Sequence, residues 1–382
     1  MSTAYFAESL AEICAHSLVA TGRQLRWLII ANPAAGGFAM RSRWKEHRRA
    51  LDACRAAARI NPLREDCAPA EIAAKRGADA AACGLVSTDG PGAAARIVSA
   101  LIDEAREQAG PFYLIITAGG DGTHLEALSV LYHAPEPVRL NMAVLRLPMG
   151  TGNDGADSPE LAGALGLLTG PSRLEFIPAL RLLPAPGGPA TRSKDFLAFN
   201  ILSVGLDAFV TYMTNKMKGK LPGDFYKLWV DIAALFYDRL YKVGPLDVRA
   251  LDRLGEVLSF REKILLLAVG ASGYRTYGSQ QRILPDDRNV CAVRQMPLFR
   301  KLAFKGLLAA GVHVDAPEST LFNAQRVEFS GSHPMLAQMD GETVLLGRED
   351  FPAAIELTPP VIPVLKPGGG IGTGDWRPGT GD

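Results

Sequence analysis

The chain of 382 residues has room for two or three domains, and 48% hydrophobic with 21% charged residues is typical of a globular protein. Lys and Arg number 41 against 40 Asp and Glu. The chain therefore lacks the excess of positive charge that is typical of a nucleic-acid-binding protein. The five cysteines are scattered and odd in number, which predicts reduced thiols in a cytoplasmic protein. No apolar run is long enough to span a bilayer, so we expect any contact with a membrane to be at its surface.

Residues 1–24 are predicted to form an N-terminal extension, and from Leu25 onward short apolar segments alternate with helical patterns. The expected strands cover residues 28–31, 112–117 and 142–147, and the expected helices cover residues 41–59, 92–108 and 123–133. Strands that alternate with helices are typical of a doubly wound parallel sheet. We therefore predict an α/β domain over residues 25–173.

After residue 174 the pattern changes to strand-like segments with few helices between them. The expected strands cover residues 174–177, 196–204, 263–269, 290–295, 326–329 and 336–346, and one helix is expected over residues 225–241. This pattern predicts an antiparallel, β-rich second domain over residues 174–349. Residues 366–382 are rich in Gly and Pro and are predicted to be a disordered tail.

The strand expected over residues 112–117 runs directly into the glycine-rich sequence GGDGT at residues 119–123. Thr123 and Glu126 have the spacing of a capping box, which predicts a helix that begins at Thr123. Bare backbone N–H groups at the start of a helix form a site for phosphate. Asp121 would repel a phosphate there, and Mg²⁺ between the two removes the conflict, because this ion binds carboxylates together with substrate phosphates. An ordinary βα turn with a capping aspartate is the other interpretation.

A second glycine-rich turn, GTGND at residues 150–154, follows the strand expected over residues 142–147. Gly150, Gly152 and Gly155 also fit the G-x-G-x-x-G fingerprint of dinucleotide-binding proteins, with Glu175 at a suitable distance for a ribose contact. That fingerprint needs a helix that opens within the glycines, whereas the next helix is expected to start at residues 158–159. The sequence therefore favours a second phosphate-binding turn over a dinucleotide fold.

Together with NPAAGG at residues 32–37, these turns resemble the catalytic domain of the diacylglycerol kinase family, which includes bacterial lipid kinases and sphingosine kinases. The resemblance continues with GLDA at residues 205–208, DD at 286–287 and DGE at 340–342, in the order of the family's motifs. It implies an N-terminal α/β domain like that of NAD kinases and a C-terminal β-sandwich that binds the lipid acceptor. It also implies that residues 350–365 return to the first domain.

The resemblance implies a kinase that uses ATP and Mg²⁺ to phosphorylate the hydroxyl of diacylglycerol or a related lipid. Asp121 and Glu342 are the candidate catalytic residues, and either could accept the proton of the hydroxyl. The candidate metal ligands are Asp121, Asp154 and Asp207 for Mg²⁺, and Asp287 for a separate structural metal site. The residues implied to bind the nucleotide are Asn32, Pro33, Gly36, Gly119, Gly120, Gly122, Thr123, Gly150, Thr151, Gly152 and Asn153. Phosphoryl transfer needs mainly positioning and charge neutralisation, which such residues supply.

The sequence departs from the family pattern near two of these turns. The Ser or Arg that is frequent around the first glycine motif is absent, and Gly155-Ala156-Asp157 stands where an aromatic residue, Ala and Arg are typical. Basic residues at 41–49 form either a solvated helix face or a surface that attracts anionic lipid headgroups. The lysines at 216–220 precede the helix expected over residues 225–241, which is either an amphipathic helix that covers the β-rich domain or a membrane-docking edge where acyl chains enter.

The family resemblance also implies a cytoplasmic protein that associates peripherally with the membrane surface holding its lipid substrate, and a homodimer. Two other functions remain possible from the sequence. One is a soluble-substrate kinase of the NAD kinase type. The other is a catalytically silent sensor of nucleotide or lipid, although such a sensor has no need of the carboxylates that the sequence retains.

Overall fold

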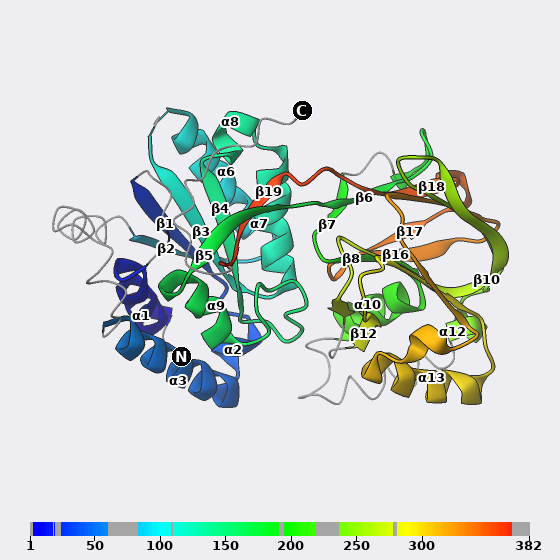
Figure 1. The fold of residues 1–382 in the computed structure, drawn as a ribbon, viewed down its shortest axis with the longest axis horizontal. Helices are drawn as coiled ribbons and strands as arrows, with labels where there is room; N and C mark the ends of the chain where they lie inside the picture. Colours follow the sequence, from blue (N-terminus) through cyan, green and yellow to red (C-terminus); the bar gives the residue numbers. More distant parts are fainter. Residues whose placement is uncertain are drawn as a thin grey trace. The chain divides into compact units, whose positions relative to one another are not determined.

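The computed structural model describes residues 3–17, 19, 24–59, 83–107, 110–190, 195–217, 237–277 and 281–368. The chain forms two compact units, Met1–Ile177 with Val361–Asp382 and Pro178–Pro360 (Figure 1). We expected the first unit to end at residue 173 and the chain to return at residue 350. The actual limits are later because β5 (Ser172–Ile177) and β19 (Ile362–Pro367) pair with each other inside the first unit. Of the predicted tail, residues 369–382 lie outside the described residues.

The first unit is built on a six-stranded sheet in the order β2-β1-β3-β4-β19-β5. Its parallel strands are β1 (Leu25–Ala31), β2 (Cys83–Ser87), β3 (Phe112–Gly119) and β4 (Met142–Pro148). β19 runs parallel to β4 and antiparallel to β5. Every residue of β3 and β4 is buried, as expected for strands covered on both faces. The predicted parallel α/β sheet is confirmed.

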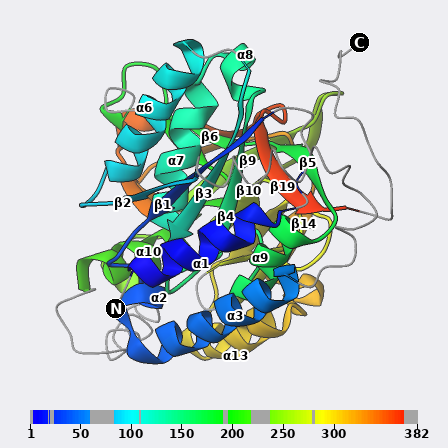
Figure 2. The same ribbon diagram turned by 90° about the vertical axis from the view of Figure 1, so that its left-hand side faces the viewer.

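Helices cover both faces of this sheet (Figure 2). One layer contains α6 (Ala93–Glu107), α7 (Asp121–His133) and α8 (Glu136–Arg139), and the other contains α1 (Thr3–Ala15), α3 (Arg41–Arg59) and α9 (Leu161–Thr169). The short α2 (Gly36–Ala39) precedes α3.

The predicted N-terminal extension is an integral part of the first unit. Its helix α1 buries Phe6, Leu10 and Ile13 completely in the core shared with α3 and α9. Phe6 also packs edge-on against Phe38, with 5.0 Å between the ring centroids.

The second unit contains an eleven-stranded sheet whose pairings are all antiparallel. Its strands are β6 (Leu180–Leu183), β7 (Phe196–Ala198), β8 (Ile201–Gly205), β9 (Pro245–Leu251), β10 (Glu256–Gly270), β13 (Val290–Arg294), β14 (Ser319–Phe322), β15 (Arg326–Gly331), β16 (Met335–Met339), β17 (Glu342–Leu346) and β18 (Ala353–Leu357). The long β10 pairs with β9 through its first half and with β8 and β13 through its second half. Strands from both halves contribute to one apolar core, so the sheet folds over it as the predicted sandwich requires.

Several elements of the second unit differ from the sequence-based expectations. Residues 196–204 and 336–346, each expected to be one strand, form β7 with β8 and the hairpin β16 with β17. The helices α10 (Leu206–Met217) and α13 (Leu298–Ala310) were not predicted. Of the helix expected over residues 225–241, only α12 (Tyr237–Leu240) belongs to an element that the structure describes, and residues 225–236 lie outside its described part.

The smaller elements of this unit are the two-stranded sheet of β11 (Arg275–Tyr277) and β12 (Gln281–Leu284), and two 3₁₀ turns at His313–Asp315 and Arg348–Asp350. Across the described parts of both units, no helix is long and apolar enough to cross a membrane.

Candidate functional site

Three glycine-containing turns leave the carboxyl ends of β1, β3 and β4, which are adjacent in the sheet. Main-chain hydrogen bonds join them: Asn32 N donates to Ala118 O at 2.9 Å, and Met149 N donates to Gly119 O at 3.0 Å. Gly37 N donates to Met149 O at 2.7 Å. The strand order reverses between β1 and β3, and doubly wound sheets bind ligands at the carboxyl edge of such a point. The structure therefore brings together the three turns that the sequence singled out.

The close packing of these turns requires glycine. A Cβ atom built on Gly150 would lie 2.5 Å from Cα of Gly120, which is closer than real Cβ atoms approach. A Cβ atom on Gly37 would lie 2.9 Å from the carbonyl oxygen of Met149. Gly122 and Gly152 are exposed, so the backbone of both turns is accessible to a ligand.

Two carboxylates converge on Gly152. A Cβ atom built there would lie 2.9 Å from Oδ2 of Asp121 and 3.4 Å from Oδ2 of Asp154. Gly155 N donates to Oδ1 of Asp121 at 2.9 Å, so this carboxylate also ties the two turns together. Burial raises the pKa of Asp121 above its usual value, and backbone N–H groups of Gly155 and Asn153 oppose that rise.

This pair of carboxylates fits Mg²⁺, which typically binds one or two carboxylates and completes its shell with water and substrate phosphates. Within the described residues, no group of three or more His, Cys, Asp or Glu side chains gathers as a metal site. A cation held by Asp121 and Asp154 would therefore need oxygen ligands from a bound phosphate or from water.

The helix after the GGDGT sequence begins earlier than the capping-box spacing predicts. α7 starts at Asp121, and its N-cap residue, Gly120, provides no side-chain cap. Glu126 does not cap this helix, because its carboxylate accepts hydrogen bonds from Gly92 N at 2.7 Å and Ala94 N at 3.1 Å at the start of α6. The capping-box prediction was wrong, yet the positive end of the α7 dipole still lies at the turn, where it favours an anion.

Thr123 and Asn32 connect the first two turns through their side chains. Thr123 is buried, and its Oγ1 accepts a hydrogen bond from Asn32 Nδ2 at 3.2 Å. This contact crosses the point between β1 and β3 where the strand order reverses. Pro33 is exposed in the first turn. Gly36 is the first residue of α2, and it lies close to Thr151: a Cβ atom built on Gly36 would be 3.0 Å from the Thr151 methyl group.

Asn153 shapes the turn after β4. Its φ angle of 62° is in the left-handed region, which Asn tolerates better than most residues. Its side chain accepts a hydrogen bond from Gly150 N at 2.6 Å and donates one to Pro148 O at 3.2 Å. Asn153 therefore holds the backbone of residues 148–153 in place.

Arg43 contacts the same turn, although the sequence did not single it out as a site residue. From α3 its Nη1 donates to the carbonyl oxygen of Gly150 at 2.8 Å. The basic segment at residues 41–49 was the only sequence signal, and it did not distinguish Arg43 from the exposed Arg41 or Arg49. This residue brings a positive charge to the turns in a chain that lacks the Arg frequent around the first motif.

Asp157, which replaces the Arg typical of the family, is paired inside the first unit. Its Oδ1 lies 2.6 Å from Arg146 Nη2 on β4, and the side chains of Asp157 and Arg146 are 0% and 3% exposed. Arg146 N also donates to Oδ2 of Asp157 at 2.8 Å. Burial by itself would raise the pKa of Asp157, but the charges of Arg146 and Lys366 hold it below its usual value. The pair closes the turn of residues 149–157 back onto its own strand.

The dinucleotide-binding interpretation is contradicted by the next helix. α9 begins at Leu161, beyond Gly155, so no helix opens within the glycines of the G-x-G-x-x-G pattern. Glu175 lies on β5, paired with β19.

In the second unit, Asp207 lies in the first turn of α10 with 3% of its surface exposed. It accepts hydrogen bonds from the Ser203 hydroxyl and from Gln338 Nε2, the latter at 3.0 Å. Gln338 Oε1 accepts from Gly341 N at 3.1 Å, so the network extends to the turn that precedes Glu342. Burial raises the pKa of Asp207 to about 6, although both hydrogen bonds lower it.

We expect Asp207→Asn to be more stable than the wild type at pH 7, by up to about 3 kcal/mol at 1.4 kcal/mol per pKa unit. Because the folded-state pKa is raised, the wild type is relatively stable below the usual pKa of 3.8 and loses that stability as the pH rises through about 6. Urea unfolding at pH 4 and pH 7 checks this, since the difference between the two proteins should shrink at the lower pH. An equal stability difference at the two pH values would show that burial does not raise the pKa of the Asp207 carboxyl.

Asp340 has a structural role that the sequence analysis missed. Its carboxylate accepts hydrogen bonds from the backbone N–H groups of Phe199, Asn200 and Ile201, which fixes the hairpin turn to the start of β8. Asp340 and Gly341 have φ angles of 44° and 97°, as a tight β-hairpin turn requires. Glu342 follows as the exposed first residue of β17. The Asp-Gly pair between apolar segments was the available signal for this hairpin.

Of the two acidic residues at 286–287, Asp286 forms an ion pair with Arg288. Arg288 Nε lies 3.0 Å from Oδ1 of Asp286, and this contact lowers the pKa of Asp286. Asp287 is exposed. A separate structural metal at Asp287 stays a prediction from the family resemblance.

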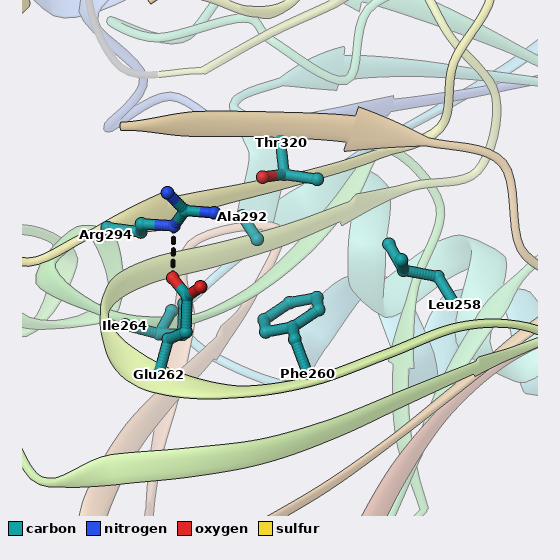
Figure 3. Close-up of a pocket in the computed structure, with 7 residues that line it drawn as sticks. All are labelled: Leu258, Phe260, Glu262, Ile264, Ala292, Arg294 and Thr320. Carbon is teal, nitrogen blue, oxygen red and sulfur yellow. Dashed lines mark ion pairs between the residues drawn. The ribbon is translucent and has the colours of Figure 1, made fainter. Parts of the chain in front are cut away.

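The second unit also contains a small cavity of about 100 Å³ (Figure 3). Leu258, Phe260 and Ile264 on β10 line it, and an ion pair between Glu262 and Arg294 lies at its polar end. None of the predicted site residues lines this cavity.

Comparison with known proteins supports the family resemblance. Residues 26–166 match the family model described as the diacylglycerol kinase catalytic domain. This match includes all three turns at the carboxyl edge of the sheet. The comparison with curated proteins gives no match.

Three solved structures from Bacillus anthracis str. Sterne share the fold. One, provisionally named a diacylglycerol kinase, is 16% identical with a TM-score of 0.55, over 91% of this chain and 96% of its own. A diacylglycerol kinase is 14% identical with a TM-score of 0.51, over 90% and 97%. A third, also provisionally named, is 17% identical with a TM-score of 0.53, over 90% and 98%. Residues 26–166 are therefore similar to the diacylglycerol kinase catalytic domain, and the three solved structures share the fold of this chain.

Proposed function

We propose that this protein is an ATP-dependent kinase that phosphorylates the hydroxyl of diacylglycerol or a related lipid. The observation that carries the proposal is the convergence of Asp121 and Asp154 on Gly152, at the edge where three glycine-containing turns meet. Backbone amides and a helix dipole favour phosphate there, whereas the two carboxylates favour a cation. Both preferences are met by a nucleotide phosphate bound together with Mg²⁺.

In this proposal each turn has its own role. The backbone of Gly119, Gly120 and Gly122, with the first amides of α7, binds nucleotide phosphates, and Gly150, Thr151 and Gly152 do so from the other side. Asn32, with Pro33 and Gly36 in the first turn, helps to hold the nucleotide, and Asn153 keeps the second turn in shape. Mg²⁺ held by Asp121 and Asp154 would neutralise phosphate charge during transfer.

The acceptor hydroxyl must lose its proton to a base. Asp121 and Glu342 are the two candidates, and Glu342 is exposed at the start of β17. Asp207 is buried and bonded to Ser203 and Gln338, so we assign it to holding the turn before Glu342, not to direct coordination of the metal. A lipid substrate also places the enzyme at a membrane surface, and we propose peripheral association from the cytoplasm.

We expect Arg43→Met to raise the KM for ATP by about tenfold, because a hydrogen bond from a charged donor contributes about 1.5 kcal/mol. The variant loses the contact that fixes the Gly150 carbonyl at 2.8 Å. Steady-state kinetics with varied ATP measure the effect, and Arg49→Met, an exposed position on the same helix, is the matched control. Equal KM values in the two variants would refute this role.

Transfer of labelled γ-phosphate from Mg·ATP to a panel of lipids in mixed micelles tests the proposed function. The panel contains diacylglycerol, monoacylglycerol, a sphingoid base, ceramide and phosphatidylglycerol, with NAD⁺ and lipid-free controls. Label in one lipid establishes the activity and identifies the acceptor class. Label in NAD⁺ supports the soluble-substrate alternative, and ATP binding without transfer to any acceptor supports the silent sensor.

A further inference from the structure

Helix α13 presents several of its apolar side chains to solvent. Phe299 is 84% exposed, Leu302 is 50% exposed and Leu298 is 37% exposed. The exposed positions of this helix are Leu298, Phe299, Leu302, Ala303, Lys305, Gly306, Ala309 and Ala310. Lys305 is the one polar side chain among them. The outer face is therefore an apolar surface with a single basic residue, Lys305.

Two of the three charged residues of α13 form ion pairs within the second unit. Lys301 is buried, and its Nζ lies 2.7 Å from Oδ1 of Asp238 on α12. Arg300 donates two hydrogen bonds, of 2.7 and 2.8 Å, to the carboxylate of Glu318. The inner side of α13 also packs Phe304 and Leu308 into an apolar core, so the helix is apolar on both sides. A surface helix of a water-soluble protein normally presents polar and charged residues outward. The exposed apolar residues indicate that another apolar medium covers the outer face.

We propose that the outer face of α13 docks on an anionic lipid surface. The proposal rests on the proposed function, because a kinase for a membrane lipid must reach the bilayer that contains it. Large apolar side chains with a basic residue beside them are typical of helices that lie in the membrane interface, and α13 is too short to span a bilayer. Interfaces between proteins usually contain several hydrogen bonds. Among the exposed side chains of α13 only Lys305 can form one, so this face fits a lipid surface better than a protein partner.

Charge around the helix agrees with this occupant. Lys305 is exposed on the helix. A second exposed basic residue, Arg282, lies beside the C-terminal end of the helix, where its Cδ atom would be 3.1 Å from a Cβ atom built on Gly311. Asp315, just beyond that end, is exposed and carries the opposite charge. Figure 1 shows α13 along the outer edge of the second unit, with α12 beside it.

Sedimentation with vesicles, without ATP or acceptor, tests the docking. The double variant Phe299→Ser/Leu302→Ser should partition at least about tenfold more weakly than the wild type onto phosphatidylcholine vesicles that contain phosphatidylglycerol. Its thermal stability should not fall, because both side chains are exposed in the folded protein. Leu254→Ser is the matched control, since Leu254 is 97% exposed between β9 and β10, and it should bind like the wild type.

Equal binding of the double variant and the wild type would overturn the docking proposal, as would a wild type that does not bind these vesicles. A dimer that the double variant abolishes would show instead that a second copy covers the face, and would also overturn it.

Kinase assays separate this inference from the proposed function. The double variant should keep its activity on a short-chain diacylglycerol in solution and lose at least about tenfold on vesicle-embedded diacylglycerol. Equal losses on both acceptors would count against docking. Absence of wild-type activity on every lipid would defeat the proposed function, whereas vesicle binding would still report on α13 by itself.

Discussion

Asp121→Asn lowers kcat by about 10²–10³-fold in our account, the effect typical of removing one electrostatic stabiliser of a transition state. The amide keeps an oxygen that can accept the 2.9 Å hydrogen bond from Gly155 N, so the two turns stay joined. The atom beside Gly152 becomes an NH₂ group, which cannot bind a cation. Phosphate-transfer kinetics with a lipid acceptor measure kcat, and thermal unfolding checks that the fold is retained.

The control for this substitution is Asp103→Asn, an exposed carboxylate on α6 whose side chain is 69% accessible. Its kcat should match that of the wild type. An unchanged kcat in Asp121→Asn as well would show that the metal site lies elsewhere. A loss of folding in Asp121→Asn would show that the negative charge of Asp121, beyond the hydrogen bond that the amide keeps, stabilises the two turns.

Asp157→Ala is expected to destabilise the protein by about 3–5 kcal/mol, because it leaves Arg146 buried without its partner. The wild-type pair is almost inaccessible to solvent, at 0% and 3% exposure, so water cannot compensate for the lost charge. The turn of residues 149–157 also loses its anchor on β4, and ATP binding should weaken with it. Urea unfolding at pH 7 measures the stability.

The double variant Asp157→Ala/Arg146→Met is the control, because removing both charges should recover part of the lost stability. The wild-type contribution should also decrease at low pH. The pKa of Asp157 is lowered in the folded state, so the stabilisation is present above the usual value of 3.8 and is lost as the pH falls through the folded-state pKa. Stability of Asp157→Ala equal to that of the wild type at pH 7 would contradict this account.

The features that could be predicted from the sequence are those set by neighbours along the chain. β3 and β4 are short runs of apolar residues bounded by glycine-rich turns, and every residue of both strands is buried. The glycines that follow them mark positions where backbone approaches backbone, as Gly150 approaches Gly120. Local composition was therefore sufficient to predict the α/β unit and its glycine-rich turns.

Contacts between distant segments could not be predicted in this way. Glu126 has the right spacing to cap its own helix, yet it caps α6, because folding places Gly92 within 2.7 Å of its carboxylate. The contact from Arg43 to Gly150 and the pair of Arg146 with Asp157 likewise depend on how elements pack. Spacing along the chain gives no information about such partners.

The second unit shows two further reasons for wrong predictions. The turn at Asp340 and Gly341 divides what the sequence suggested was one strand, although an Asp-Gly pair is a strong hairpin signal. In α13 apolar residues face both inward and outward, so the usual amphipathic pattern of a water-soluble helix is absent. The outward-facing apolar residues that made this helix hard to recognise are also the ones that support the proposed docking.

The central claim is that the turns after β1, β3 and β4 bind a nucleotide phosphate together with a divalent cation. Calorimetric titration of ATP into the wild type, with Mg²⁺ and then with EDTA, tests it most directly. We predict at least about tenfold weaker binding without the cation, because Asp121 and Asp154 would then repel the phosphates. Equal affinity under the two conditions would show that these carboxylates do not share a site with the phosphates, and would contradict the account.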